Sequence, residues 1–370
     1  MPKQKTDLFV PTGPAIEFSQ PNQIWRILEG ITVAVGEDDA IISHSPDGTT
    51  LINKGFLLGG TNTDGAAGFS VSDSVGVAFE NRKTGYVFGS LGVALNESDA
   101  VSLVNDGDIF GALNGVSASI ASNLTIENHG TIDGTRHSIR VDNGAVIPGP
   151  VIKNFGTLTS AQETISLAVA DATATIKNKP GGLIENTGDG RAIWMEDGTL
   201  KLINKGTIIG RIEADLGNDT LLNEGTITGN VSLGNDNDVY KNKGGKVDGR
   251  IDSGNGNDKL VLGNSKDRIE FDDELNAATN VDRVKNFESG KDKFFLDASD
   301  EFFGLTLGTL QKSEFTRGTE AKGGSAQLVY DKPSGQLWLD GDGVGGNGKT
   351  LFAELDDNTA LKHDDFTVYA

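Results

Sequence analysis

One short motif recurs along most of the chain and restricts its fold more than any other feature. Its clearer copies, such as LINKGFLLGG and LINKGTIIG, place Asn-x-Gly between two short apolar runs. The asparagines of the copies are Asn53, Asn81, Asn105, Asn128, Asn154, Asn178, Asn204, Asn223 and Asn242. Successive asparagines lie 19 to 28 residues apart, a spacing typical of solenoid coils. The spacing predicts a stacked array of coils.

Each copy also predicts its own local structure. Leu202 and Ile203 precede Asn204-x-Gly, and Thr207 to Ile209 follow it, which indicates a strand, a bend and a second strand. Asparagine tolerates left-handed backbone and bonds to local amides, and glycine removes the Cβ at a corner. We therefore expect a right-handed parallel β-helix of about ten coils, with coils about 4.8 Å apart. In this fold the asparagine column is a structural ladder and not a binding site.

Prolines are concentrated near the N-terminal end of the chain. Glycine is abundant, at 50 of 370 residues, whereas only 9 residues are proline, and four of these are Pro2, Pro11, Pro14 and Pro21. These four prolines lie within the first 21 residues, and a proline-rich segment favours extended backbone. We predict an extended N-terminal arm over residues 1–22, which is free, docked or lent as a strand to a neighbour, and a β-helix over residues 23–211.

A second motif joins the first from residue 212. The segments IEADLGNDTLLN, VSLGNDNDVYKN and IDSGNGNDKLVL align without gaps. The alignment stacks three columns, which are Asp215, Gly234 and Gly254; Gly217, Asp236 and Gly256; and Asp219, Asp238 and Asp258. Carboxylates one coil apart repel by roughly 1 kcal/mol per pair in water, so such a column favours a cation. Calcium accepts carboxylates together with backbone carbonyls, whereas the alternative is a set of ordinary Asp, Asn and Gly bends.

A tandem nonapeptide, residues 254–262 and 263–271, resembles the Gly-Gly-x-Gly-x-Asp repeat of repeats-in-toxin (hemolysin-type) proteins. The resemblance implies a β-roll over residues 212–275 that binds Ca²⁺ between coils. The implied sites lie between Asp219 and Asp238 and between Asp238 and Asp258, and Asp267 begins the opposite side. Only residues 254–258 match strictly, because Asp236 and Ser265 replace glycines of the family pattern.

The C-terminal part is similar to the region that follows the calcium repeats in serralysin-type proteases. Residues 277–299 carry the similarity, with Asp292 as a calcium ligand or a turn former, and residues 328–343 resemble the closing hairpin. The resemblance implies a cap over residues 276–370 that ends in a type I secretion signal. The protease domain is missing, because none of the four histidines, His44, His129, His137 and His363, forms a His-Glu-x-x-His pair.

The net charge and the absence of long apolar runs restrict the partners and the cellular location of the protein. A formal charge of -21 disfavours nucleic acid and anionic lipid as partners. No run approaches the roughly 18 apolar residues of a membrane span, and no cleavable N-terminal signal is visible. The chain has no cysteine and so no disulfides. With the resemblance, these features favour secretion by a type I pathway to the cell surface or medium.

We therefore expect a secreted, calcium-binding structural protein of the bacterial surface or extracellular matrix. It would act in adhesion, biofilm or surface-layer assembly, fold on binding calcium, and self-associate head-to-tail into filaments. The alternative is a polysaccharide-active β-helix, a lyase or epimerase, and an extracellular polysaccharide is a further partner considered. The candidate catalytic cluster for that alternative is His129, Arg136, His137 and Arg140.

Overall fold

The computed structural model describes residues 2–61, 65–143, 148–299, 301–345 and 348–370. The chain is nearly all β, with 54% strand and 2% helix, and forms a parallel β-solenoid of about 12 turns, which confirms the predicted fold class. It divides into two compact units, unit 1 (Met1–Arg211) and unit 2 (Ile212–Ala370). Each unit is described by itself below.

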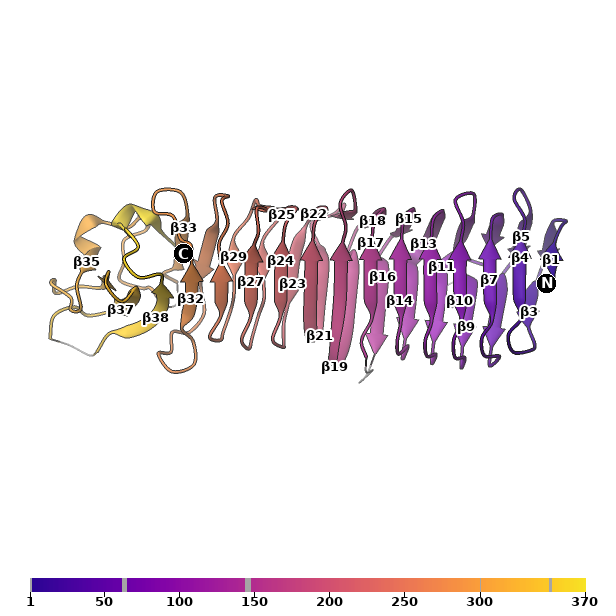
Figure 1. The fold of residues 1–370 in the computed structure, drawn as a ribbon, viewed down its shortest axis with the longest axis horizontal. Coiled ribbons are helices and arrows are strands. Elements are labelled where there is room, and N and C mark those ends of the chain that lie inside the picture. The colour runs from indigo at the N-terminus through magenta and orange to yellow at the C-terminus, as the bar shows by residue number, and fades with distance from the viewer. Residues whose placement is uncertain (1, 62–64, 144–147, 300, 346–347) are drawn as a thin grey trace. The chain divides into compact units, whose positions relative to one another are not determined.

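Each coil of unit 1 has three sides, and strands on one side pair in parallel with strands one coil away (Figure 1). Side 1 contains β1 (Lys3–Gln4), β4 (Ile24–Ile27), β7 (Thr50–Asn53), β10 (Ala78–Asn81), β12 (Ser102–Asn105), β14 (Thr125–Asn128), β17 (Val151–Asn154) and the last parts of β19 (Ile165–Asn178) and β21 (Arg191–Asn204). Side 2 contains β2 (Leu8–Val10), β5 (Thr32–Val35), β8 (Phe56–Leu58), the first parts of β11 (Tyr86–Asn96) and β13 (Asp108–Ser119), β15 (Thr131–Gly134), β18 (Thr157–Ser160), β20 (Leu183–Asn186) and β22 (Thr207–Ile209). Side 3 contains β3 (Ile16–Phe18), β6 (Ile41–His44), β9 (Ala67–Ser72), the last parts of β11 and β13, β16 (His137–Asn143) and the first parts of β19 and β21.

The N-terminal segment forms a coil and is not an arm outside the coils, so that prediction is wrong for residues 3–18. Strands β1, β2 and β3 pair in parallel with β4, β5 and β6. The four early prolines all lie outside these strands, where no ladder hydrogen bond needs their missing N–H. The prolines therefore mark the corners of the first coil.

The asparagines of side 1 form the predicted ladder. From Asn53 to Asn178 the Nδ2 atom of each side chain donates to the Oδ1 atom of the asparagine one coil further on, at 2.7 to 3.0 Å, and Asn204 accepts the last of these bonds. All seven side chains are fully buried, and the residue two positions earlier is a buried aliphatic or phenylalanine in each coil. The glycine after each asparagine allows close approach of the coils: a Cβ on Gly130 would lie 1.9 Å from the carbonyl oxygen of Gly107.

Unit 2 begins with three-sided coils and continues with two-sided ones. One stack contains β24 (Thr220–Asn223), β27 (Val239–Asn242), β30 (Lys259–Val261), β32 (Asp282–Lys285) and β38 (Thr350–Leu355). A second stack contains β23 (Arg211–Ala214), β26 (Val231–Ser232), β29 (Ile251–Asp252), β31 (Arg268–Phe271), β33 (Lys293–Asp297) and β39 (Phe366–Tyr369). The third side has only β25 (Thr226–Thr228) and β28 (Lys246–Val247), so after β30 the chain passes directly to β31. The tandem nonapeptide thus forms a two-sided coil.

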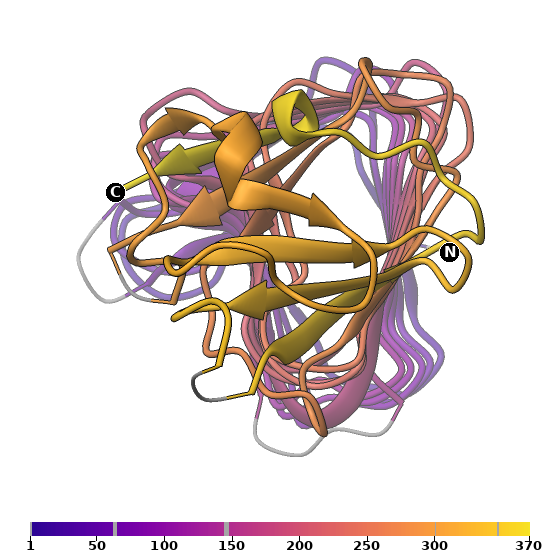
Figure 2. The same ribbon diagram turned by 90° about the vertical axis from the view of Figure 1, so that its left-hand side faces the viewer.

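The predicted C-terminal hairpin is confirmed. Strands β36 (Gln327–Asp331) and β37 (Gln336–Asp340) pair antiparallel, and β37 also pairs antiparallel with β38. In Figure 2 the orange and yellow strands of this cap face the viewer. The remaining elements are β34 (Gly308–Thr309), η1 (Lys312–Glu314), β35 (Phe315–Arg317) and η2 (His363–Asp365). Strands β38 and β39 add one coil after β32 and β33. This coil and the coil of β1 to β3 were not predicted, which explains why the solenoid has about 12 turns and not ten.

Candidate calcium site

Two columns of buried aspartates lie in unit 2, each residue at or just before the start of a strand. The first column is Asp219, Asp238, Asp258 and Asp282, and the second is Asp267, Asp292 and Asp365. Every one of these residues is at most 2% exposed. Carboxylates are rarely buried to this extent unless a hydrogen bond, a cation or a proton compensates them. The structure thus brings the predicted column of Asp219, Asp238 and Asp258 together and adds Asp282 to it.

The turns before the first column depend on left-handed backbone. The aligned residues Gly217, Asp236 and Gly256 have φ of +110°, +84° and +155°. Asp236 therefore adopts, at some cost, a conformation that favours glycine. Its carboxylate accepts the N–H of Gly217 at 3.2 Å, which compensates this departure from the family pattern. A groove of about 390 Å³ runs beside these turns.

Gly254 is required for two reasons, left-handed φ and close approach of the coils. Its φ is +79°, and a Cβ there would lie 1.8 Å from the carbonyl oxygen of Gly234. We expect Gly254→Ala to lower the free energy of unfolding by at least about 2 kcal/mol, measured by urea unfolding. Gly244 has φ of +81° and nothing within 4 Å of its Cβ position, so Gly244→Ala should cost only about 1 kcal/mol. Equal losses in both variants would contradict the close approach.

Hydrogen bonds satisfy only one carboxylate oxygen of Asp238 and of Asp258 among the described residues, whereas both oxygens of Asp282 accept hydrogen bonds. The Oδ1 atom of Asp238 accepts the N–H of Asp219, and the Oδ1 atom of Asp258 accepts the N–H of Asp238, both at 2.7 Å. The Oδ2 atoms of Asp238 and Asp258 are buried and have no hydrogen-bond partner among the described residues. A buried, unsatisfied carboxylate oxygen is costly, so this column needs a further partner.

Burial also changes the acidity of the first column. Desolvation raises the pKa of Asp238 to about 9, with a smaller contribution from the neighbouring carboxylates of Asp219 and Asp258. Desolvation likewise raises the pKa of Asp258 to about 6 and the pKa of Asp282 well above its ordinary value. Around neutral pH, Asp238 therefore holds a proton unless a cation takes its place.

The second column is satisfied by amides. The carboxylate of Asp267 accepts the N–H of Gly263 at 3.1 Å and the side-chain Nδ2 of Asn242 at 2.9 Å. The carboxylate of Asp292 accepts the N–H groups of Asp267 and Glu288 at 3.0 and 2.9 Å. Both oxygens of each side chain are used, so this arrangement favours the turn-forming role over the ligand role for Asp267 and Asp292.

A third acidic group, which the sequence analysis did not single out, consists of Asp252, Asp272 and Asp273. One carboxylate oxygen from each lies within 4.8 Å of the others, and they line a cavity of about 10 Å³. Burial raises the pKa of Asp252 to about 7 and that of Asp272 to about 6, and the Oδ1 atom of Asp272 is buried without a hydrogen-bond partner among the described residues. A cavity of this size holds one water or ion. Asp252 ends β29, and Asp272 and Asp273 directly follow β31 one coil further on. The only sign of this group in the sequence is the pair Asp272-Asp273.

The candidate catalytic residues of unit 1 lie in two places, with His129 after β14 and the others at or next to β16. His129 follows β14 and stacks on Phe155, with ring centroids 4.5 Å apart. His137 begins β16, is 5% exposed, and contacts the carbonyl oxygen of Glu163 at 3.0 Å, and burial lowers its pKa. Arg140 pairs with Asp142. His129, His137 and Arg140 each have a contact outside the set, with Phe155, Glu163 and Asp142, which does not favour joint acid-base catalysis.

Comparisons with known proteins do not place the chain in a family. No protein-family model matches it, and neither does any curated protein. No helix in the described ranges is long and apolar enough to cross a membrane. The likeness to repeats-in-toxin proteins therefore depends on the residues and turns described above.

Proposed function

We propose that this protein is a calcium-binding structural or adhesive protein that acts outside the cell. A β-solenoid is consistent with structural and adhesin-like roles. The observation that carries the calcium proposal is that the buried Oδ2 atoms of Asp238 and Asp258 have no hydrogen-bond partner in the described part of the chain. Two such oxygens one coil apart match the preference of Ca²⁺ for several hard oxygen ligands.

The ligands of this proposal come from successive turns. Asp219, Asp238 and Asp258 would supply carboxylates, and the turns that begin at Gly234 and Gly254 would supply carbonyl oxygens. The bound ion would supply the positive charge that the buried column lacks, and it would replace the proton on Asp238. The group of Asp252, Asp272 and Asp273 has the same donor chemistry and is included in the proposal as a second place for calcium.

Calcium would then make folding depend on the compartment. Extracellular modules typically bind calcium in the range of about 10⁻⁴ to 10⁻³ M, far above cytosolic calcium. An ion that binds the folded state alone stabilises it by mass action. In this proposal unit 2 gains its stability only after type I secretion, as the resemblance to repeats-in-toxin proteins implies. Surface or matrix assembly would follow, through strand edges that the cap does not cover.

Titration of chelator-treated protein with calcium tests this function. We expect the circular dichroism signal for β-structure, the midpoint of thermal unfolding and the particle size in light scattering to rise near millimolar calcium. The rise in the first two follows from ion binding to the folded state, and the third reports assembly. Complete β-structure in chelator, with the same unfolding midpoint and size after calcium, would contradict the proposal.

A further inference from the structure

A groove on the outside of unit 1 gathers positive charge. It has a volume of about 560 Å³ and spans side 1 in the first coils. Its basic lining residues are Lys3, Arg26, Lys54, Arg82 and Lys83, against only two acidic ones, Glu29 and Asp106. The chain as a whole has a formal charge of -21, so the sign of the charge in this groove is opposite to that of the protein.

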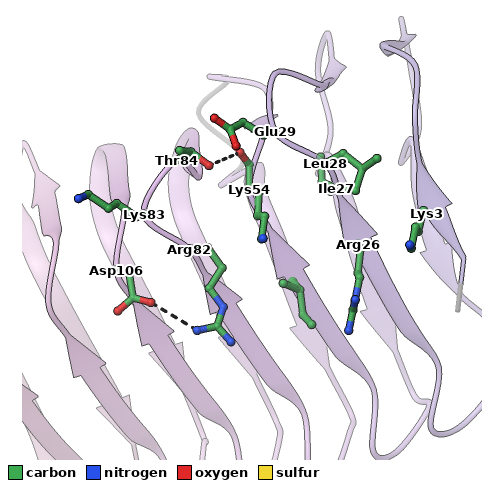
Figure 3. A pocket seen from close by; sticks show the side chains of 11 residues that line it. Lys3, Arg26, Ile27, Leu28, Glu29, Lys54, Arg82, Lys83, Thr84 and Asp106 are labelled. Atoms are coloured by element: carbon green, nitrogen blue, oxygen red, sulfur yellow. Dashed lines mark hydrogen bonds and ion pairs between the residues drawn. The ribbon is translucent and has the colours of Figure 1, made fainter.

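The register of the coils places these basic residues in a row along side 1. Lys3 on β1 lies opposite Arg26 on β4, and both point outward because their neighbours along the strand point inward. Lys54 and Arg82 each follow a ladder asparagine and hydrogen-bond through their N–H to the coil before. Figure 3 shows the nitrogen-bearing ends of Arg26, Lys54 and Arg82 extending from neighbouring coils toward the same side.

Most of these cations have no carboxylate partner among the described residues. Of these five cations, only Arg82 pairs with carboxylates in the part of the chain that the structure describes, with Glu80 and, at 3.5 Å, with Asp106. Lys3, Lys54 and Lys83 are exposed. The Nε atom of Arg26 is buried and has no hydrogen-bond partner among the residues that the structure describes. The groove therefore has uncompensated positive charge and a hydrogen-bond donor without an acceptor. An anionic ligand would supply both the negative charge and the acceptor.

The neighbouring residues limit the kind of anion. Further along the same side, His129 and Phe155 stack on each other and Lys179 lies 5.8 Å from the Phe155 ring centroid, so these ring faces are already covered. None of the described residues that line the groove is aromatic. Single-stranded nucleic acids depend on free aromatic faces for base stacking, which the groove does not offer. A chain that presents single anionic groups at intervals suits it better.

We propose that this groove binds an acidic polysaccharide, whose carboxylate or sulfate groups pair with Lys3, Arg26, Lys54 and Lys83. Coils repeat about every 4.8 Å, which is comparable with one sugar residue of an extended chain, so successive sugars would meet successive cations. This site lies in unit 1 and is independent of the calcium proposal.

Isothermal titration with short oligogalacturonates and with dextran sulfate tests the site, and the two probes distinguish carboxylate from sulfate recognition. We expect wild-type protein to bind at least one probe, with affinity that falls as salt increases, and not to bind neutral dextran. The exposed-lysine variant Lys3→Glu/Lys54→Glu/Lys83→Glu should bind at least about tenfold more weakly, because three attractive contacts become repulsive.

A matched control separates the groove from net charge. Lys243→Glu/Lys266→Glu/Lys312→Glu changes three exposed lysines of unit 2 and alters the formal charge equally. We expect it to keep wild-type affinity, and both variants to keep the wild-type circular dichroism spectrum. Three results would overturn the proposal: no binding of either probe, an equal loss in the control variant, or equally tight binding of single-stranded DNA.

Discussion

In the presence of a chelator, raising the pH from about 5 to about 8 is expected to lower the midpoint of thermal unfolding. The folded-state pKa values of Asp238, about 9, and Asp258, about 6, lie above the ordinary value of 3.8. Between the ordinary and the raised pKa the folded state holds more protons than the unfolded state, so its stability falls as pH rises. For Asp258 the shift from 3.8 to about 6 corresponds to roughly 2 to 3 kcal/mol in total, of which about half is lost above pH 5.

Calcium should reverse this dependence. The ion binds the deprotonated carboxylates, so at about pH 8 added calcium is expected to restore the unfolding midpoint. The measurement is thermal unfolding by circular dichroism across a pH series, with chelator and with calcium. In Asp238→Asn/Asp258→Asn both the fall with pH and the response to calcium should shrink. The control Asp171→Asn/Asp189→Asn removes two exposed carboxylates of unit 1 and should behave as wild type, whereas an unchanged profile in the first variant would refute this assignment.

Asn128→Ala is expected to lower the free energy of unfolding by roughly 3 to 5 kcal/mol. The Asn128 side chain is fully buried, donates to the Oδ1 atom of Asn154 at 2.9 Å and accepts from the Nδ2 atom of Asn105 at 2.8 Å. Its removal interrupts the ladder and leaves buried polar atoms of both neighbours without this partner. Urea unfolding followed by circular dichroism measures the loss.

Asn96 provides the control for the ladder. Its side chain is exposed at the end of β11, so Asn96→Ala should change stability by no more than about 0.5 kcal/mol. If Asn128→Ala cost as little as Asn96→Ala, the asparagine column would not be a stabilising ladder.

The sequence predicts the parts of this fold that repeat. A fixed interval between Asn-x-Gly motifs is enough to indicate coils, because stacking is the only way such short strands bury their apolar residues. The same reasoning aligned Asp219, Asp238 and Asp258 one coil apart, as the hydrogen bonds between them show. The hairpin of β36 and β37 was also predicted, from the resemblance of residues 328–343 to the closing hairpin of serralysin-type proteins.

Features that depend on contacts between coils were not visible. Prolines near the start suggested an arm, because sequence alone does not show that strands between prolines have partners. Asp238 and Asp267 both end a turn before a strand, yet only the second finds amide donors for both oxygens. The difference arises at Oδ2, which in Asp267 accepts the N–H of Gly263 four residues earlier in the same turn, whereas the Oδ2 atom of Asp238 finds no donor among the described residues. The spacing of the residues does not reveal this difference in turn geometry.

The sequence analysis did not predict the positive charge of the groove, for a similar reason. The net charge of -21 describes the whole chain, whereas Lys3, Arg26 and Lys54 are far apart in sequence and meet only through the coil register. The group of Asp252, Asp272 and Asp273 likewise joins the ends of two strands one coil apart. The net charge therefore disfavoured nucleic acid and anionic lipid as partners of the whole surface, and the groove is one surface whose charge differs from that average.

Direct calcium binding tests the central claim most closely. Isothermal titration of chelator-treated protein should show calcium binding to wild type in the millimolar range or tighter, with protons released on binding. The variant Asp238→Asn/Asp258→Asn should bind fewer ions, and Asp171→Asn/Asp189→Asn should bind as many as wild type. Absence of calcium binding in wild type, or the same number of ions in all three proteins, would contradict a calcium site in the first aspartate column.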